Sequence, residues 1–192
     1  HDTSAKIRKQ MEWTKEDKAL IWTEIVSEKI KQQALLLERY GKNEANMLYG
    51  YMSEVEFGDI TNREGHAAKV YFNALFGKSF TRTDEIPTNA ALNYGYSIIF
   101  SSGYLTQIGL FHDNMFNQFN LASDFMEPFR PLVDEMVVEL KPNCFEKDEK
   151  HRMLGLLNKE VEIAGKREIL GNVFDALNDR DISQIRFYFN EL

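Results

Sequence analysis

The chain has 192 residues and carries 23 Lys and Arg against 30 Asp and Glu, a formal net charge of −7 with His neutral. Its 43% apolar content can bury a sizeable core and excludes global disorder, while the acidic balance argues mildly against nucleic acid as a partner. The single cysteine, Cys144, excludes an internal disulfide. No apolar run reaches the roughly 18–20 residues of a membrane span, so we expect a cytoplasmic protein.

Helical patterns dominate the first part of the chain, in agreement with its low content of 11 Gly and 4 Pro. Thr14 is a typical N-cap residue, and the segment after it, 15–40, has helical periodicity and is expected to end at Gly41. Its apolar stripe consists of Trp22, Val26, Ile30 and Leu37. A shorter helix is expected over 43–54, and a loop at 58–59.

A capping-box pattern opens the next helix. In the sequence TNRE at 61–64, the Glu64 carboxylate would reach back to the Thr61 backbone amide. This helix is expected to end at Gly77, and its buried face would hold Ala67, Tyr71, Ala74 and Leu75. Glu64 lies on the same face, where a carboxylate is costly unless it is paired or binds a metal, so a functional role is the alternative to capping.

Prolines organise the middle of the chain. Pro87 fits the first turn of a helix that reaches Phe100, and a further apolar helix is expected over 104–111. An amide-rich loop, 112–120, follows. The helix after this loop is expected to be kinked at Pro131.

The C-terminal elements are shorter. We expect a helix over 149–157, a possible small β-hairpin over 161–169 with its turn at 164–165, and a helix over 172–177. The fold class is therefore predicted to be all-α and multi-helix, with at most one small hairpin near the C-terminus. The whole chain is expected to form a single domain with a looser tail from about residue 141.

Four side chains are candidates for chemistry, although each also has a structural explanation. Glu64 could be a cap, His112 could satisfy the last carbonyls of a helix, and Asp124 and Glu127 could complement a helix dipole. Taken together, two carboxylates and one imidazole suit Mg²⁺ or Mn²⁺. Spacing alone leaves open whether these residues converge. No Gly-rich phosphate loop, zinc spacing or nucleophilic Ser or Cys arrangement is present in the sequence.

Three segments carry a resemblance to a known family: 62–72 (NREGHAAKVYF), 109–112 (GLFH) and 121–131 (LASDFMEPFRP). Read together, they resemble the C-terminal domain of Cas1, the CRISPR-associated integrase family that inserts new spacers into CRISPR arrays. The segment 117–124 (NQFNLASD) is similar to its type II-A branch. The resemblance is close from about residue 11 to residue 139 and looser in the tail.

The resemblance implies an all-helical catalytic domain in which Glu64, His112 and Glu127 are catalytic and bind one Mg²⁺ or Mn²⁺, with Asp124 as a nearby support. The implied reaction is transesterification, in which the 3′-hydroxyl of a prespacer attacks a phosphodiester of the CRISPR repeat, with an associated DNA endonuclease activity. The DNA would supply the nucleophile, in agreement with the lack of a nucleophilic side-chain arrangement in the sequence.

The resemblance also implies partners. Arg130 is expected to face a DNA phosphate, Asn89 and Asn93 to border the site, and Lys69 to belong to a basic patch that follows the DNA backbone. The implied partners are double-stranded DNA, a second copy of the chain, the small Cas2 dimer that bridges two copies, and other type II-A CRISPR proteins. The implied location is the cytoplasm of a prokaryote.

The chain departs from the family pattern in two places. The N-terminal β-rich domain that builds the family's homodimer is not present before His1, and a short stretch of helix is missing between Phe100 and Ser101. We expect that a segment has been left out of the sequence at the second place. Two alternatives stay open: a catalytically inert, all-helical interaction module of the same fold, and a helical hydrolase that uses the same metal on a small substrate.

Overall fold

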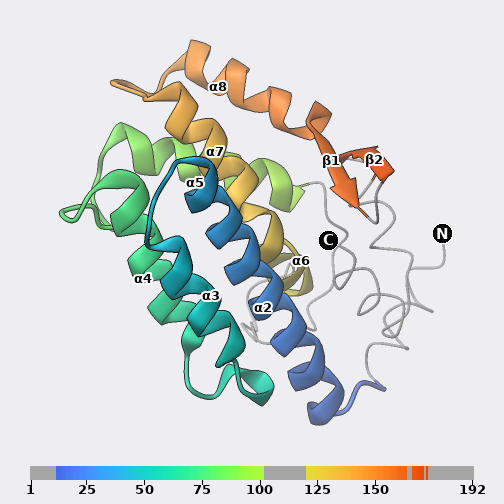
Figure 1. Cartoon of the computed structure of the whole chain (residues 1–192). Coiled ribbons are helices and arrows are strands. Elements are labelled where there is room, and N and C mark those ends of the chain that lie inside the picture. The colour runs from blue at the N-terminus through green and yellow to red at the C-terminus, as the bar shows by residue number, and fades with distance from the viewer. Residues whose placement is uncertain (1–11, 102–119, 164–165, 171, 173–192) are drawn as a thin grey trace.

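A computed structural model describes residues 12–101, 120–163, 166–170 and 172, which form a body of packed helices with one small hairpin (Figure 1). In chain order, its α-helices, 3₁₀-helices (η) and strands are α2 (Lys15–Arg39), α3 (Ala45–Ser53), η1 (Phe57–Asp59), α4 (Arg63–Phe76), α5 (Pro87–Ser101), α6 (Asn120–Phe125), η2 (Glu127–Phe129), α7 (Arg130–Leu140), α8 (Lys147–Met153), η3 (Leu154–Asn158), β1 (Glu160–Ile163) and β2 (Lys166–Ile169). The predicted fold class is confirmed.

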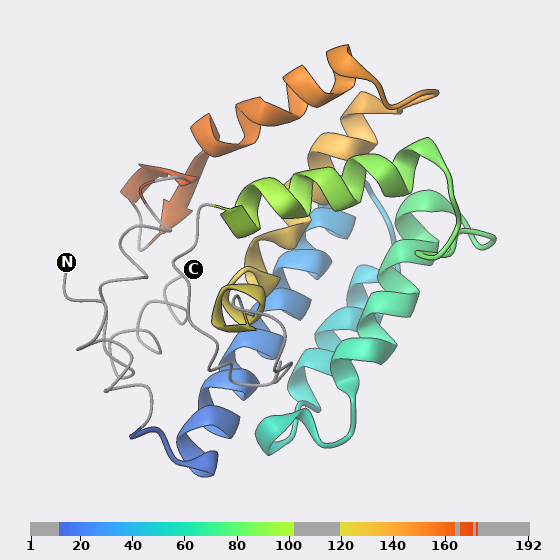
Figure 2. The ribbon, with the colours of Figure 1, turned by 180° about the vertical axis from the view of Figure 1, so that it is seen from behind.

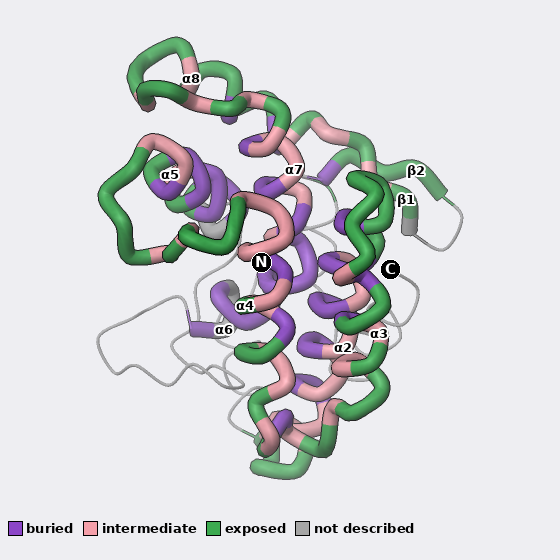
Figure 3. Tube along the Cα trace, turned by 60° about the vertical axis from the view of Figure 1, so that its left-hand side comes forward, coloured by how far each residue is buried: buried purple, intermediate pink, exposed green. Residues whose placement is uncertain are grey.

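Helix α2 is the centre of the packing. Thr14 caps it as predicted, because Thr14 Oγ1 accepts a hydrogen bond from the Asp17 amide at 3.1 Å and Asp17 Oδ2 accepts one from the Thr14 amide at 3.0 Å. All four residues of its predicted apolar stripe are buried, with at most 3% exposure. Helix α2 contacts α3, α4 and η1 and also η2 and α7, and buried residues gather where these elements meet (Figure 3).

Helices α5, α7 and α8 form a second group that packs beside α2 (Figure 2). Gly95 allows their close approach. A Cβ atom at this position would lie 2.3 Å from Val133 Cγ1 on α7 and 2.6 Å from Met153 Cε on α8. Such distances are shorter than any van der Waals contact, so a larger residue at position 95 would force the three helices apart.

The predicted hairpin is present. Strands β1 and β2 pair in an antiparallel arrangement that places Glu160 opposite Ile169 and Ile163 opposite Lys166. The predicted turn at 164–165 lies outside the described residues, as do the predicted helix over 104–111 and nearly all of the one over 172–177. None of the helices in the described part of the chain is both long enough and apolar enough to cross a membrane.

Two local predictions are wrong. The N-cap of α4 is Asn62 rather than Thr61, so the predicted capping box between Thr61 and Glu64 does not form. Pro131 does not kink a helix, because α7 begins at Arg130, directly after the short helix η2. Pro131 therefore occupies the first turn of α7, where its missing N–H group would have no helical acceptor in any case.

Candidate metal centre

The loop before α4 fixes the start of that helix. The carboxylate of Asp59 accepts hydrogen bonds from the backbone amides of Arg63 at 2.7 Å and Glu64 at 3.1 Å, and Asn62 Oδ1 accepts one from the Gly65 amide at 3.2 Å. Asp59 and Asn62 both have left-handed backbone conformations, with φ of 52° and 53°, which Asp and Asn tolerate better than most residues. These bonds satisfy the first amides of α4, so the Glu64 carboxylate is not required as a cap.

The Asn62 cap explains why glycine stands at position 65, in the first of the three motif segments. A Cβ atom at Gly65 would lie 2.7 Å from Oδ1 and 2.8 Å from Nδ2 of Asn62. Any side chain at this position would displace the Asn62 amide group from the end of the helix. Gly65 therefore has a structural reason to stand next to Glu64.

Glu127 comes from the other side of the body. It begins η2, which contacts α2, α6 and α7, and only 2% of Glu127 is exposed. Its Oε1 lies 2.8 Å from Arg130 Nη2, one turn further along the chain. A buried carboxylate needs such partners, because an isolated charge in the interior is strongly unfavourable.

Lys29 joins the two acids. Its Nζ atom lies 2.5 Å from Glu64 Oε1 and 2.5 Å from Glu127 Oε2, and Lys29 itself is only 5% exposed. Burial lowers the pKa of Lys29, but the carboxylates of Glu127 and Glu64 outweigh burial and raise it above the ordinary 10.5, so the ammonium group stays charged. Two residues that the sequence predicted as ligands of one cation therefore converge on one cationic atom.

Lys29 was missed by the sequence analysis, although a signal was present. It stands three residues after Val26 and directly before Ile30, so it lies at the edge of the buried stripe of α2. A lysine is rarely buried unless it is paired with an acid. The site therefore combines two acidic and two basic side chains, Glu64, Glu127, Lys29 and Arg130, whose formal charges cancel.

Arg130 also contacts an aromatic ring next to the site. Its Cζ atom lies 4.8 Å from the centroid of the Tyr96 ring, and Arg82 Cζ lies 5.4 Å from the same centroid. About 30% of the Arg130 side chain is exposed, so its guanidinium group is shared between Glu127, Tyr96 and solvent. Its predicted contact with DNA stays a prediction.

A second buried acid, Asp134, lies beneath Tyr96. It is 1% exposed, its Oδ2 accepts a hydrogen bond from Tyr71 Oη at 2.8 Å, and its Oδ1 accepts one from Tyr96 Oη. Burial raises the pKa of Asp134 to about 6, and the two tyrosine hydrogen bonds oppose this rise. Burial and the neighbouring Asp134 also raise the pKa of both tyrosines well above 10, so the phenols remain donors.

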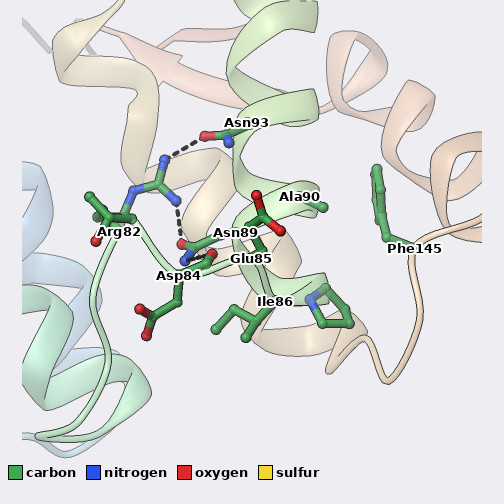
Figure 4. A pocket seen from close by; sticks show the side chains of 10 residues that line it. Arg82, Asp84, Glu85, Ile86, Asn89, Ala90, Asn93 and Phe145 are labelled. Atoms are coloured by element: carbon green, nitrogen blue, oxygen red, sulfur yellow. Dashed lines mark hydrogen bonds between the residues drawn. The ribbon is translucent and has the colours of Figure 1, made fainter.

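The predicted asparagines lie beside a hollow of about 530 Å³ that is lined by the loop before α5, the first turns of α5 and Phe145 (Figure 4). Asn89 is 3% exposed and its Nδ2 donates to the carbonyl oxygens of Thr81 at 2.8 Å and Asp84 at 2.9 Å. Arg82 donates to Oδ1 of Asn89 at 2.6 Å and of Asn93 at 2.7 Å. Both asparagines therefore hold this loop, and their predicted position at the border of the acidic site stays a prediction.

Asp124, Lys69 and His112 are the other predicted site residues. Asp124 is fully buried on α6, which contacts η2, and Lys69 is exposed on α4. His112 lies outside the described residues, so the third predicted ligand stays a prediction. Within the described ranges, no group of three or more His, Cys, Asp or Glu side chains is arranged to hold a metal ion.

The two acids nevertheless fit a divalent ion. Glu64 and Glu127 each place one oxygen within 2.5 Å of a single point, which the Lys29 Nζ atom marks. Mg²⁺ is commonly bound in proteins by one or two carboxylates, with water and substrate phosphate as the other ligands, and Mn²⁺ accepts the same oxygen donors. The donor type and the convergence of these side chains therefore agree with the predicted cofactor.

Comparison with known proteins identifies similar sequences. The family model described as "CRISPR associated protein Cas1" matches residues 1–162. The chain is 45% identical over 132 residues to the CRISPR-associated endonuclease Cas1 of Neisseria meningitidis serogroup C (strain 8013), a match that covers 64% of this chain and 43% of that relative. It is 27% identical over 171 residues to the enzyme of the same name from Leptospira interrogans serogroup Icterohaemorrhagiae serovar Lai (strain 56601), covering 79% and 61%.

The chain therefore spans less than two thirds of the length of either relative. Among solved structures, a casposase bound to its integration product is similar with a TM-score of 0.71 and 20% sequence identity. That match covers 100% of this chain and 67% of the casposase chain. At this identity the likeness shows a shared fold.

Proposed function

Because the chain belongs to the CRISPR-associated Cas1 protein family, we propose that it is the C-terminal catalytic domain of a metal-dependent DNA integrase of CRISPR adaptation, of the type II-A branch. In the proposed reaction, the 3′-hydroxyl of a prespacer attacks a phosphodiester of the CRISPR repeat. A new P–O bond forms, the old one breaks, and the released repeat strand keeps the oxygen as a hydroxyl. With water as the nucleophile, the same site would cut DNA, in agreement with the endonuclease name of the relatives.

The observation that carries this proposal is the convergence of Glu64 and Glu127. These residues lie in separate sequence motifs and on separate elements, α4 and η2, yet both carboxylates reach the same atom, Lys29 Nζ, at 2.5 Å. Glu127 is buried and the Glu64 side chain is 25% exposed, and two acids brought this close together are unfavourable for stability unless a cation joins them. A site for a divalent cation explains why the chain keeps both.

Each residue then has a proposed role. Glu64, Glu127 and His112 hold the ion, and when Mg²⁺ or Mn²⁺ is bound it supplies a Lewis acid for the phosphoryl oxygen of the substrate. Asp59 fixes the first turn of α4 and hence the position of Glu64. Arg130, which keeps one side of Glu127 paired, offers its exposed donors to a DNA phosphate.

The other predicted residues complete the proposal. Asp124 supports the segment that carries Glu127, because its helix α6 contacts η2. Lys69, Asn89 and Asn93 contact DNA further from the reacting phosphate. We propose that the protein acts as a homodimer on double-stranded DNA in the prokaryotic cytoplasm, together with a Cas2 dimer that bridges two copies and with other type II-A CRISPR proteins.

Replacement of Glu64 by glutamine tests the function. Glu64→Gln keeps the shape of the side chain and removes its charge, so we expect strand transfer of a labelled prespacer into repeat DNA to fall about a hundredfold or more. Duplex binding should change little, and strand transfer is measured at a temperature at which the variant is folded, because Lys29 then keeps only Glu127 as its acidic partner. The control is Glu54→Gln, because Glu54 pairs with Arg63 at 3.1 Å near the start of the same helix but is 54% exposed. Normal integration by Glu64→Gln would refute the catalytic assignment.

One observation favours the second candidate, an inert interaction module. Lys29 and Arg130 already neutralise the two acids, as expected of a structural ion-pair cluster. In that case the wild-type protein would show no strand transfer with either Mg²⁺ or Mn²⁺. The same assay therefore separates the two candidates.

A further inference from the structure

The ammonium group of Lys29 lies where an ion bound by both acids would have to lie. Its Nζ atom is 2.5 Å from Glu64 Oε1, to which it donates a hydrogen bond, and 2.5 Å from Glu127 Oε2. Mg²⁺ binds carboxylate oxygens at about 2.0–2.1 Å, so the two cations would need nearly the same space between the same two oxygens.

The ammonium and the divalent ion therefore exclude each other. Two cations that close together, in a site where Lys29 is 5% and Glu127 2% exposed, would repel strongly because little water screens them. Arg130 does not compete in the same way, since it pairs with the other carboxylate oxygen of Glu127, Oε1. Of the two basic side chains, Lys29 is the one that would have to move when an ion enters.

We propose that Lys29 is a positioning residue that holds Glu64 and Glu127 together in the ion-free protein and is displaced from them by the divalent cation. This inference rests on the proposed function, because it needs the two acids to be ligands. Lys29 thus has two opposed effects: it keeps the ligands assembled, and it competes with the ion for them. Its long and flexible side chain allows the ammonium group to move while α2 stays in place.

The test replaces Lys29 in the full-length protein and measures metal binding directly. Lys29→Met keeps an apolar stem and removes the competing charge, so we expect the Kd for Mn²⁺, measured by calorimetry and by electron paramagnetic resonance, to fall at least tenfold. The ion-free variant should unfold at a lower temperature than the wild type, because two acids lose their shared cation. Saturating Mn²⁺ should reverse most of this loss.

The matched control lies on the same helix. Lys31 pairs with Glu28 at 3.1 Å, and its side chain is 36% exposed, so Lys31→Met removes an equal charge without touching either acid. We expect its Mn²⁺ affinity to equal that of the wild type. Lys29→Arg, which keeps a positive charge, should bind Mn²⁺ no more tightly than the wild type does.

Each failure has a distinct meaning. An unchanged or weaker Mn²⁺ affinity of Lys29→Met would overturn the inference, and so would a variant that stays unfolded in saturating Mn²⁺, because the ion would then be unable to replace the ammonium. If the wild type bound no Mn²⁺ at a site that Glu64→Gln removes, the proposed function itself would fail. Tight binding by the wild type, lost in Glu64→Gln and unchanged in Lys29→Met, would refute only the role of Lys29.

Discussion

Glu127 and Asp134 are both buried acids, yet the helical body stabilises them by different means. Glu127 contacts two cationic side chains, Lys29 and Arg130, at 2.5 and 2.8 Å. Asp134 accepts hydrogen bonds from two phenols, those of Tyr71 and Tyr96. The first arrangement places positive charge in direct contact with a carboxylate, whereas in the second the direct contacts are dipoles and the charges of Arg130 and Arg82 act from further away.

This difference in partners distinguishes a carboxylate that can become a metal ligand from one whose role is structural. A carboxylate held by mobile cationic side chains can exchange one of them for another cation. Among the described residues, Asp134 has two phenols and no ion pair as its direct contacts, and burial raises its pKa to about 6. Burial of an acid alone therefore does not indicate a metal site, and the type of partner is the informative feature.

The largest expected effect comes from neutralising each acid in turn. Glu127→Gln removes a proposed ligand, so we expect integration to fall about a hundredfold or more. Asp134→Asn leaves the contacts of Glu64, Glu127 and Lys29 unchanged, so its integration rate should stay within a few fold of the wild type. Strand-transfer rates, measured at a temperature at which both variants are folded, check this. Equal losses in the two variants would remove the functional distinction between the acids.

Asp134 should make its own contribution to the pH dependence of stability. Its pKa is about 6 in the folded protein and about 3.9 in an unfolded chain, so the folded state binds more protons between these values. The free energy of unfolding should therefore fall by about 3 kcal/mol in all from this group as the pH rises, with most of the fall between pH 4 and 7. Urea denaturation of the wild type and of Asp134→Asn over this range tests it. The difference between the two curves should change with pH, and a constant difference would contradict the prediction.

The smallest expected effect comes from Tyr96, which donates a hydrogen bond to Asp134 and contacts Arg130, the partner of Glu127. Tyr96→Phe removes a hydrogen bond to Asp134 but keeps the ring beside Arg130, so we expect a loss of about 2 kcal/mol in the free energy of unfolding at pH 8. The loss should be smaller at pH 5, where Asp134 is protonated. Tyr94→Phe is the control, because the Tyr94 ring packs against Phe145 and has no contact with Asp134 among those described. Equal losses at the two pH values would contradict the account.

The sequence predicted the helices well because their signals are local. The N-cap at Thr14, the apolar stripe of α2 and the start of α5 at Pro87 each depend on residues a few positions apart. The failures at Thr61 and Pro131 are also local. Asn62 rather than Thr61 caps α4, and α7 begins at Arg130, so in both cases the helix boundary lies one residue away from the position that the pattern favoured.

The site could be predicted only in part. The family resemblance identified Glu64 and Glu127 as partners, and the structure brings them together around Lys29. Periodicity could place Lys29 only at the edge of the buried stripe of α2, because it is 35 residues from Glu64 in the sequence and periodicity does not show which elements meet. The left-handed conformation of Asp59 was equally hidden, since it depends on how the loop packs against α2.

Gly95 has a practical consequence for the C-terminal part of the chain. Because α5 touches both Val133 and Met153 at this one position, a bulky side chain there would act as a wedge between α8 and the helices beneath it. Position 95 is therefore a place from which the packing of α8 could be loosened, and the contacts of Arg130 would report the change, because Tyr96 follows this glycine and Val133 lies one turn after Arg130.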